Sequence, residues 1–242
     1  MSSGPVHVDL MSSDIAASRA FYGAVLGWSF EEWGPASLAL VDGRQAAAIG
    51  PSFDGTTTGW TLYFGSTDIA STEQAIVEAG GTLVLPHGDV AELGKLLLAA
   101  DPTGARCGIW QAGTKKGVDA WGETGFPCWT DLRTSDPAAA QAFYAAALGF
   151  EMTAFDMAGP DYATYSTGGD PHGGVGGMMG APDGTSSHWL VYFAMPSADD
   201  AAAAVAPAGG TLLSDPFDTP FGRMAPAVDP HGHPFWITQL PS

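Results

Sequence analysis

The sequence is poor in cysteine, in basic residues and in long apolar runs. Its two cysteines, Cys107 and Cys128, form no spaced framework, so neither a disulfide scaffold nor a cysteine metal site is indicated. Eight Lys and Arg stand against 26 Asp and Glu, and the net charge of −18 repels phosphate backbones and anionic lipid. No apolar run approaches the ~20 residues of a membrane span, and no signal peptide is evident. We therefore expect a cytoplasmic protein that binds neither nucleic acid nor membrane.

What the sequence does contain is an internal repeat. Three blocks recur in the same order along the 242 residues, and chance does not produce such an order. We expect a first copy over residues 1–112, a linker over 113–126 and a second copy over 127–242. The matching blocks are Phe21-Tyr22…Leu26-Gly27 with Phe143-Tyr144…Leu148-Gly149, Trp60…Tyr63-Phe64 with Trp189…Tyr192-Phe193, and Asp101-Pro102-Thr-Gly104 with Asp229-Pro230-His-Gly232.

Each copy has the same predicted elements. Asp14 and Asp136 can cap a helix, and Gly27 and Gly149 stand where a helix needs a left-handed residue after its last turn. Aromatic and β-branched runs predict strands before and after these helices. The expected strands are Val6–Leu10, Trp60–Phe64 and Ala105–Gln111 in the first copy and Cys128–Leu132, Trp189–Phe193 and His233–Gln239 in the second, with second helices at about 69–79 and 198–208.

These motifs together resemble the vicinal oxygen chelate superfamily, which includes glyoxalases, bleomycin-resistance proteins and extradiol dioxygenases. Trp189-x-x-Tyr192-Phe193 and Phe221-Gly222-Arg223 further resemble two-module, glyoxalase-like actinobacterial proteins. Some of those are labelled hydroxylases or lyases, and others accompany polyketide biosynthesis. The resemblance implies an α+β fold with two tandem βαβββ modules, paired as half-barrels whose concave faces hold the site.

The resemblance also implies where metal ligands would stand. The first-strand position is His7 or Trp129, the second falls on Leu62 or Val191, and the third, normally Glu, falls on Gly108 or Trp236. A catalytic metal needs about three protein ligands, and only His7 qualifies. We therefore expect no metal and no cofactor. His7 is either an ordinary hydrogen-bonded strand residue or a contact to a bound ligand.

The same positions define the predicted concave face, because side chains alternate along a strand. Aromatic walls with few polar groups suit a flat or hydrophobic ligand. For each aromatic, an ordinary core role is the alternative. The predicted ligand-binding residues are His7, Trp60, Leu62, Phe64, Gly108, Trp110, Trp129, Phe155, Tyr162, Met178, Met179, Trp189, Val191, Phe193 and Trp236.

These patterns favour a metal-free protein that binds a hydrophobic or aromatic small molecule, for sequestration and resistance or for an accessory role in natural-product biosynthesis. An alternative is an isomerase, lyase, dioxygenase or hydroxylase-like enzyme that uses a cryptic metal or the acid–base candidates His7, Asp9 and Asp131. The two Asp residues could instead hold strand-to-helix turns. A protein–protein module is a third reading. We expect a monomer whose modules pair within the chain, with a dimer left open.

Overall fold

The first copy folds into one mixed, eight-stranded sheet. The computed structural model describes residues 2–52, 58–155, 162–167, 176–182 and 184–241. The strand order is β2-β3-β4-β1-β5-β8-β7-β6, with parallel pairing of β1 to β4 and of β5 to β8. The elements are β1 (Ser2–Met11), α1 (Ile15–Leu26), β2 (Ser29–Trp33), β3 (Ala36–Val41), β4 (Arg44–Gly50), β5 (Gly59–Ser66), α2 (Ile69–Glu78), β6 (Thr82–Val90), β7 (Gly94–Ala100) and β8 (Arg106–Ala112).

The second copy repeats this arrangement in a nine-stranded sheet. Its order is β10-β11-β12-β9-β13-β17-β16-β14, and β15 pairs with β16. The α+β class with paired modules is thus confirmed, and each copy contains the βαβββ order twice. The elements are β9 (Pro127–Thr134), α3 (Pro137–Leu148), β10 (Phe150–Ala154), β11 (Ala163–Thr167), β12 (Gly176–Gly180), β13 (His188–Ala194), α4 (Ala198–Val205), β14 (Thr211–Leu212), β15 (Phe217–Thr219), β16 (Gly222–Val228) and β17 (Pro234–Gln239).

The helix ends follow from the residues that stop them. The Asp14 side chain accepts a hydrogen bond from the Ala17 amide at 2.9 Å, and Asp136 does the same for Ala139 at 3.0 Å. Gly27 and Gly149 close α1 and α3 with φ of 72° and 71°, a conformation that a side chain disfavours. In the described residues no helix is long and apolar enough to cross a membrane.

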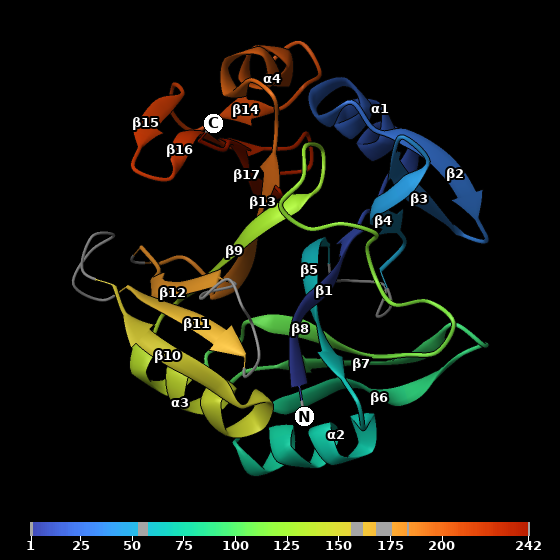
Figure 1. Ribbon diagram of the computed structural model, residues 1–242, viewed down its shortest axis with the longest axis vertical. Helices are drawn as coiled ribbons and strands as arrows, with labels where there is room; N and C mark the ends of the chain where they lie inside the picture. The colour runs from blue at the N-terminus through green and yellow to red at the C-terminus, as the bar shows by residue number, and fades with distance from the viewer. Residues whose placement is uncertain (1, 53–57, 156–161, 168–175, 183, 242) are drawn as a thin grey trace. The chain divides into compact units, whose positions relative to one another are not determined.

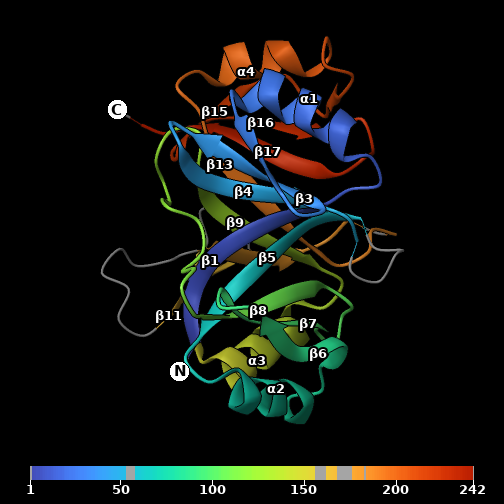
Figure 2. The ribbon, with the colours of Figure 1, turned by 90° about the vertical axis from the view of Figure 1, so that its right-hand side faces the viewer.

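The chain divides into two compact units, and each takes segments from both copies. Unit 1 contains residues 1–7, 61–117 and 130–189, and unit 2 contains 8–60, 118–129 and 190–242. Within unit 1, α2 lies beside α3, and within unit 2, α1 lies beside α4 (Figures 1 and 2). The sheets keep to 1–112 and 127–242, which we retain as the proposed limits of the copies.

The paired glycines of the repeat explain part of this interleaving. Gly80 and Gly209 have φ of 90° and 93° and turn the chain after α2 and α4. A Cβ on Gly81 would lie 2.7 Å from the Phe143 ring, and one on Gly210 would lie 2.6 Å from the Phe21 ring. Each Gly-Gly motif therefore makes room for the Phe-Tyr motif of the other copy.

Both units have an aromatic core of the same design. In unit 2, the Trp60 indole donates a hydrogen bond to the Tyr22 hydroxyl at 3.0 Å. In unit 1, the Trp189 indole does the same to Tyr144, also at 3.0 Å. The indole N–H, which is costly to bury alone, is thus satisfied inside each core. The core rings are Phe21, Tyr22, Trp28, Trp60, Phe193 and Phe235 in unit 2 and Phe64, Phe143, Tyr144, Phe150, Tyr165 and Trp189 in unit 1.

Candidate functional site

The strands β5 and β13 present the opposite face to the one that the sequence analysis predicted. Phe64 packs in the core of unit 1, with ring centroids 5.4 Å from Trp189 and 5.1 Å from Phe150. Phe193 packs in unit 2 at 5.1 Å from Trp60. Six predicted cavity residues therefore lie in the cores, on the strand face opposite to the predicted one, and their contact with a ligand stays a prediction. They are Trp60, Leu62, Phe64, Trp189, Val191 and Phe193.

The error has a simple physical origin. The second ligand position was placed by counting back from the following helix, and a shift of one residue moves every side chain to the other face of a strand. The residues that share a face with His7 and Gly108 are Tyr63 on β5 and, in the second copy, Tyr192 on β13.

In the first copy, the former ligand positions form a packed group in unit 1. The His7 and Tyr63 rings lie 5.6 Å apart, centroid to centroid. Tyr63 pairs in register with Gly108, and a Cβ on Gly108 would overlap the Tyr63 ring. Only glycine fits at position 108, because the Tyr63 ring occupies the space that a Cβ would need. On β8 the Trp110 indole donates to the Lys115 carbonyl at 2.9 Å, whereas Asp9, half-buried on β1, belongs to unit 2.

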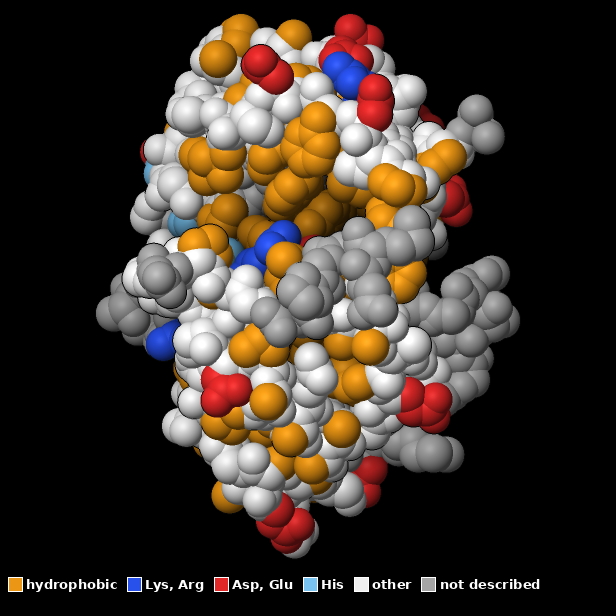
Figure 3. Space-filling view, turned by 90° about the vertical axis from the view of Figure 1, so that its left-hand side faces the viewer, with side chains coloured by type: hydrophobic (Ala, Val, Ile, Leu, Met, Phe, Trp, Pro, Cys, Tyr) orange, Lys and Arg blue, Asp and Glu red, His pale blue; other side chains and the backbone are white. Residues whose placement is uncertain are grey.

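In the second copy, the equivalent positions form an aromatic surface in unit 2. Tyr192 and Trp236 pair in register and stack at 5.1 Å with an interplanar angle of 17°. Phe217 meets Trp236 edge-on at 6.1 Å and is 39% exposed. We call Tyr192, Trp236 and Phe217 the aromatic shelf; Trp129 is half-buried on β9, next to β13 in the sheet. Hydrophobic side chains gather in a hollow on the face that carries β15 and β16 (Figure 3).

A polar group on β9 belongs to unit 1. The Tyr162 hydroxyl donates to Asp131 Oδ1 at 2.8 Å, and Arg133 Nη2 lies 3.6 Å from Asp131 Oδ2. Arg133 Nη1 also contacts the Met179 sulfur. Phe155 approaches Tyr162 with ring centroids 6.2 Å apart. Asp131, Tyr162 and Met179, three predicted site residues from separate parts of the sequence, are thus brought together with an arginine that was not predicted.

Met178 is a further correction. It pairs in register with Leu132, and both side chains are fully buried in the core of unit 1. Its neighbour Met179 pairs with Arg133 on the opposite face of β12 and is half-buried. Alternation along the strand allows only one of two consecutive methionines to face a site.

Four residues of these groups were missed. Alternation along β9 puts Arg133 on the same side as Trp129 and Asp131, and this signal was in the sequence. Tyr63 and Tyr192 were lost to the shift of one residue on β5 and β13. Phe217 lies on β15, which pairs with β16. This strand has only three residues, too few for a periodic pattern in the sequence to predict the pairing.

The His231-Gly232-His233 segment forms part of a turn that the Asp229 side chain stabilises. Asp229 Oδ1 accepts hydrogen bonds from the His231 and His233 amides, each at 2.9 Å. Its Oδ2 accepts from the Tyr22 hydroxyl at 3.2 Å and lies 3.0 Å from His233 Nδ1. Within the described residues, no group of three or more His, Cys, Asp or Glu could hold a metal ion.

This network predicts an acid-sensitive contribution to stability. Burial raises the pKa of Asp229, but the hydrogen bonds from His233 and His231 outweigh it and leave the pKa below the usual 3.8. The contribution is therefore present above pH 3.8 and is lost as the pH falls through the lower, folded pKa. In urea unfolding, Asp229→Asn should cost about 1.5–3 kcal/mol at pH 7 and less at pH 2.5. The exposed Asp215→Asn is the matched control, and an equal cost of D229N at both pH values would contradict the prediction.

Neither cysteine is expected to act as a nucleophile. Burial raises the pKa of the Cys107 thiol and of the Cys128 thiol, each to about 12. At pH 8 only ~10⁻⁴ of either would be thiolate, the reactive form. Ellman's reagent should therefore leave the folded protein unmodified and label two thiols after denaturation in guanidinium. Rapid labelling of the folded protein would contradict the buried placement of Cys107 and the half-buried placement of Cys128.

The comparisons with known proteins agree with this architecture. Residues 129–238 match the family model described as "Glyoxalase-like domain". Residues 5–42 match the family model described as "Bleomycin resistance protein-like N-terminal". "Putative glyoxylase CFP32" of Mycobacterium tuberculosis (strain CDC 1551 / Oshkosh) is 35% identical over 96% of this chain and 93% of its own length. The chain belongs to the vicinal oxygen chelate superfamily. Within it, this protein is a tandem-module member of glyoxalase- and bleomycin-resistance-like type.

Other relatives extend this picture of the superfamily member. "Anthracycline biosynthesis protein DnrV" of Streptomyces peucetius is 31% identical over 98% of this chain and 93% of the relative. The match to the crystal structure of the Mn(II)-bound glyoxalase from Novosphingobium aromaticivorans covers 99% of this chain and 83% of the glyoxalase chain. The TM-score is 0.68 and the sequence identity is 15%. The match to the structure of a catechol 2,3-dioxygenase covers 99% of this chain and 89% of the dioxygenase chain, with a TM-score of 0.69 and 13% sequence identity. At these identities the two structures share the fold with this vicinal oxygen chelate protein.

Proposed function

We propose that this vicinal oxygen chelate protein binds a hydrophobic, aromatic small molecule without a metal, either to sequester it or as an accessory protein of natural-product biosynthesis. The observation that carries the proposal is the aromatic shelf. Trp129, Tyr192 and Trp236 occupy the second-copy positions where metal-dependent relatives would place ligands. Aromatic faces at these positions favour stacking with a flat molecule.

The residues present do not fit the metal that the superfamily often carries. In the second copy, two of the three positions are Trp, whose indole offers no metal-binding lone pair. In the first copy, Gly108 has no side chain and lies beneath the Tyr63 ring, which leaves His7 and a phenol. Neither set reaches the three N, O or S ligands of a catalytic site. We derive no metal-dependent step.

The shelf also indicates the shape of the ligand. Tyr192 is almost fully buried and supports Trp236, which is half-buried and therefore presents part of its indole face. Phe217 stands edge-on to that indole and borders it. A planar, fused-ring molecule fits such a surface best. The relative named for anthracycline biosynthesis supports this class, because anthracyclines contain planar fused rings.

The test is a titration followed by tryptophan fluorescence. A panel of anthraquinones, naphthoquinones and aliphatic compounds of matched size is added to the wild type and to Trp33→Leu. Trp33 is exposed on β2 and lies outside the shelf, so its loss removes background emission without touching the site. We expect saturable quenching by the fused-ring compounds in both proteins. Absence of saturable quenching by every aromatic compound would overturn the proposal.

A second candidate is an acid–base enzyme of the same superfamily. The observation in its favour is the 2.8 Å hydrogen bond from Tyr162 to the buried Asp131, which is the kind of pair that can hold and pass a proton. If this candidate is correct, Asp131→Asn abolishes turnover of a bound aromatic compound but leaves its dissociation constant within about twofold. Unchanged product formation by D131N would remove the candidate.

A further inference from the structure

Arg133 on β9 has donors that the described residues do not satisfy. Nη1 contacts the Met179 sulfur, a weak acceptor, and Nη2 lies 3.6 Å from Asp131 Oδ2, beyond hydrogen-bond distance. Nε is buried and has no hydrogen-bond partner among the described residues. A guanidinium offers five N–H donors in a fixed plane and normally places them on oxygen acceptors. Among the described residues, the Arg133 side chain has no oxygen acceptor within hydrogen-bond distance.

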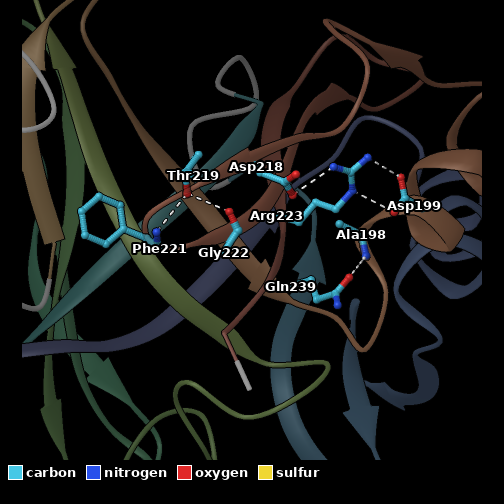
Figure 4. Close-up of polar contacts among 8 residues, drawn as sticks. All are labelled: Ala198, Asp199, Asp218, Thr219, Phe221, Gly222, Arg223 and Gln239. Carbon is cyan, nitrogen blue, oxygen red and sulfur yellow. Dashed lines mark hydrogen bonds and ion pairs between the residues drawn. The ribbon is translucent and has the colours of Figure 1, made fainter.

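Arg223 shows how the same protein satisfies an arginine that has a structural role. Its Nε and Nη2 donate to the two oxygens of Asp199 at 2.8 and 2.9 Å, and Nη1 donates to Asp218 at 3.0 Å (Figure 4). These contacts join β15 and β16 to the start of α4, while Phe221 points away from them (Figure 4). All three nitrogens of Arg223 donate to carboxylates within hydrogen-bond distance, whereas among the described residues the only carboxylate contact of the Arg133 nitrogens is the longer Nη2–Asp131 ion pair at 3.6 Å.

The arrangement around Arg133 keeps Asp131 from closing on it. The Tyr162 hydroxyl holds Asp131 Oδ1, and a Cβ on Gly177 would overlap both the Tyr162 hydroxyl and Asp131. Gly177 is therefore required for the tyrosine to reach the carboxylate. Asp131 Oδ1 accepts from Tyr162 and Oδ2 stays 3.6 Å from Arg133 Nη2, so the carboxylate does not form a two-pronged hydrogen-bonded pair with the arginine. The Arg133 side chain is 19% exposed although its Nε is buried, so a small molecule can reach it only from its exposed side.

We propose that Arg133 is a subsite for an acceptor oxygen, which binds a carboxylate or carbonyl oxygen of a small molecule through the exposed part of its guanidinium. Asp131 makes the pair neutral overall, and Tyr162 fixes the carboxylate so that the guanidinium keeps its orientation. The proposal goes beyond the proposed function, because it concerns a subsite in unit 1, whereas the aromatic shelf belongs to unit 2. Its first test uses no aromatic ligand and therefore stands apart from that function.

The first test observes the guanidinium directly. The chain has five arginines, so a ¹H–¹⁵N spectrum of their Nε–H groups contains at most five signals. Arg133→Met identifies the Arg133 signal, and Arg133→Lys does so with the charge kept. On titration with acetate, the Arg133 signal should shift and saturate, while that of Arg223 should stay fixed. No shift at Arg133, or parallel and non-saturating shifts of all exposed arginines (an adventitious ion only), would overturn the proposal.

The second test asks whether an aromatic carboxylate uses this subsite. The probes are 2-naphthoate, methyl 2-naphthoate and 2-methylnaphthalene, which share a ring system and differ in acceptor strength. At 0.15 M salt, which screens the net charge of −18 beyond about 8 Å, the wild type should prefer the carboxylate to the hydrocarbon by about tenfold or more. In R133M that preference should disappear, with the affinity for 2-methylnaphthalene unchanged.

The two tests separate the proposals. Equal affinity of the wild type for all three probes would overturn the subsite and leave aromatic binding standing. A saturable acetate shift at Arg133 with no binding of any naphthalene would support the subsite and remove the proposed function.

Discussion

Replacement of Phe64 by alanine should lower the free energy of unfolding by about 3–5 kcal/mol. Phe64 is fully buried, and its ring contacts Tyr144, Phe150 and Trp189 within the core of unit 1. Removal of the ring leaves a cavity that this rigid aromatic surround cannot fill. Urea unfolding monitored by far-ultraviolet circular dichroism measures the change.

The matched control for this prediction is Phe221→Ala. Phe221 is 45% exposed, and its removal should change stability by no more than about 0.5 kcal/mol. A loss below about 1 kcal/mol for F64A, together with a loss of ligand affinity, would contradict the core assignment. That outcome would return Phe64 to a ligand-contacting face and restore the strand parity that the sequence analysis assumed.

The second large effect is on binding. Replacement of Trp236 by leucine should weaken the affinity for a planar aromatic ligand by about 2 kcal/mol, or ~30-fold. Trp236 stacks on Tyr192 and is bordered by Phe217, so leucine removes the ring face while it keeps an apolar side chain. Because Trp236 is only half-buried, the melting temperature should fall far less than in F64A. Calorimetric titration gives the affinity.

Two further variants give the Trp236 prediction its control. Trp33→Leu removes an exposed tryptophan of β2 and should leave the affinity unchanged. Tyr192→Phe keeps the stacked ring and should bind within about threefold of the wild type. Equal weakening by W236L and W33L would indicate a non-specific effect, and full affinity in W236L would remove the shelf from the site.

The sequence was sufficient for the features that depend on local chemistry. Helix caps at Asp14 and Asp136, left-handed Gly27 and Gly149 and the repeated blocks each have a nearby physical cause and could be read from the chain. The interleaving of the copies could not be predicted from the sequence, because it depends on contacts between distant segments, such as that of Phe143 with Gly81. A linear order of elements does not say which helix packs beside which.

The candidate site was predictable only in part. His7, Trp129 and Asp131 were positioned by their own strands, whose last residues are close to a recognisable helix cap. The faces of β5 and β13 were inferred from a more distant landmark, and one residue of error exchanged Tyr63 for Leu62 and Tyr192 for Val191. Arg133 needed only the alternation already applied to Asp131, whereas Phe217 depends on a short strand that no pattern reveals.

The most direct test of metal-free aromatic binding is a calorimetric titration before and after chelation. The protein is dialysed, its content of Zn, Ni, Fe and Mn is determined, and a fused-ring ligand is titrated with and without prior treatment with EDTA. The shelf of Tyr192, Trp236 and Phe217 predicts metal far below one equivalent and the same dissociation constant in both titrations. One equivalent of metal that survives dialysis, with binding lost on its removal, would contradict the account.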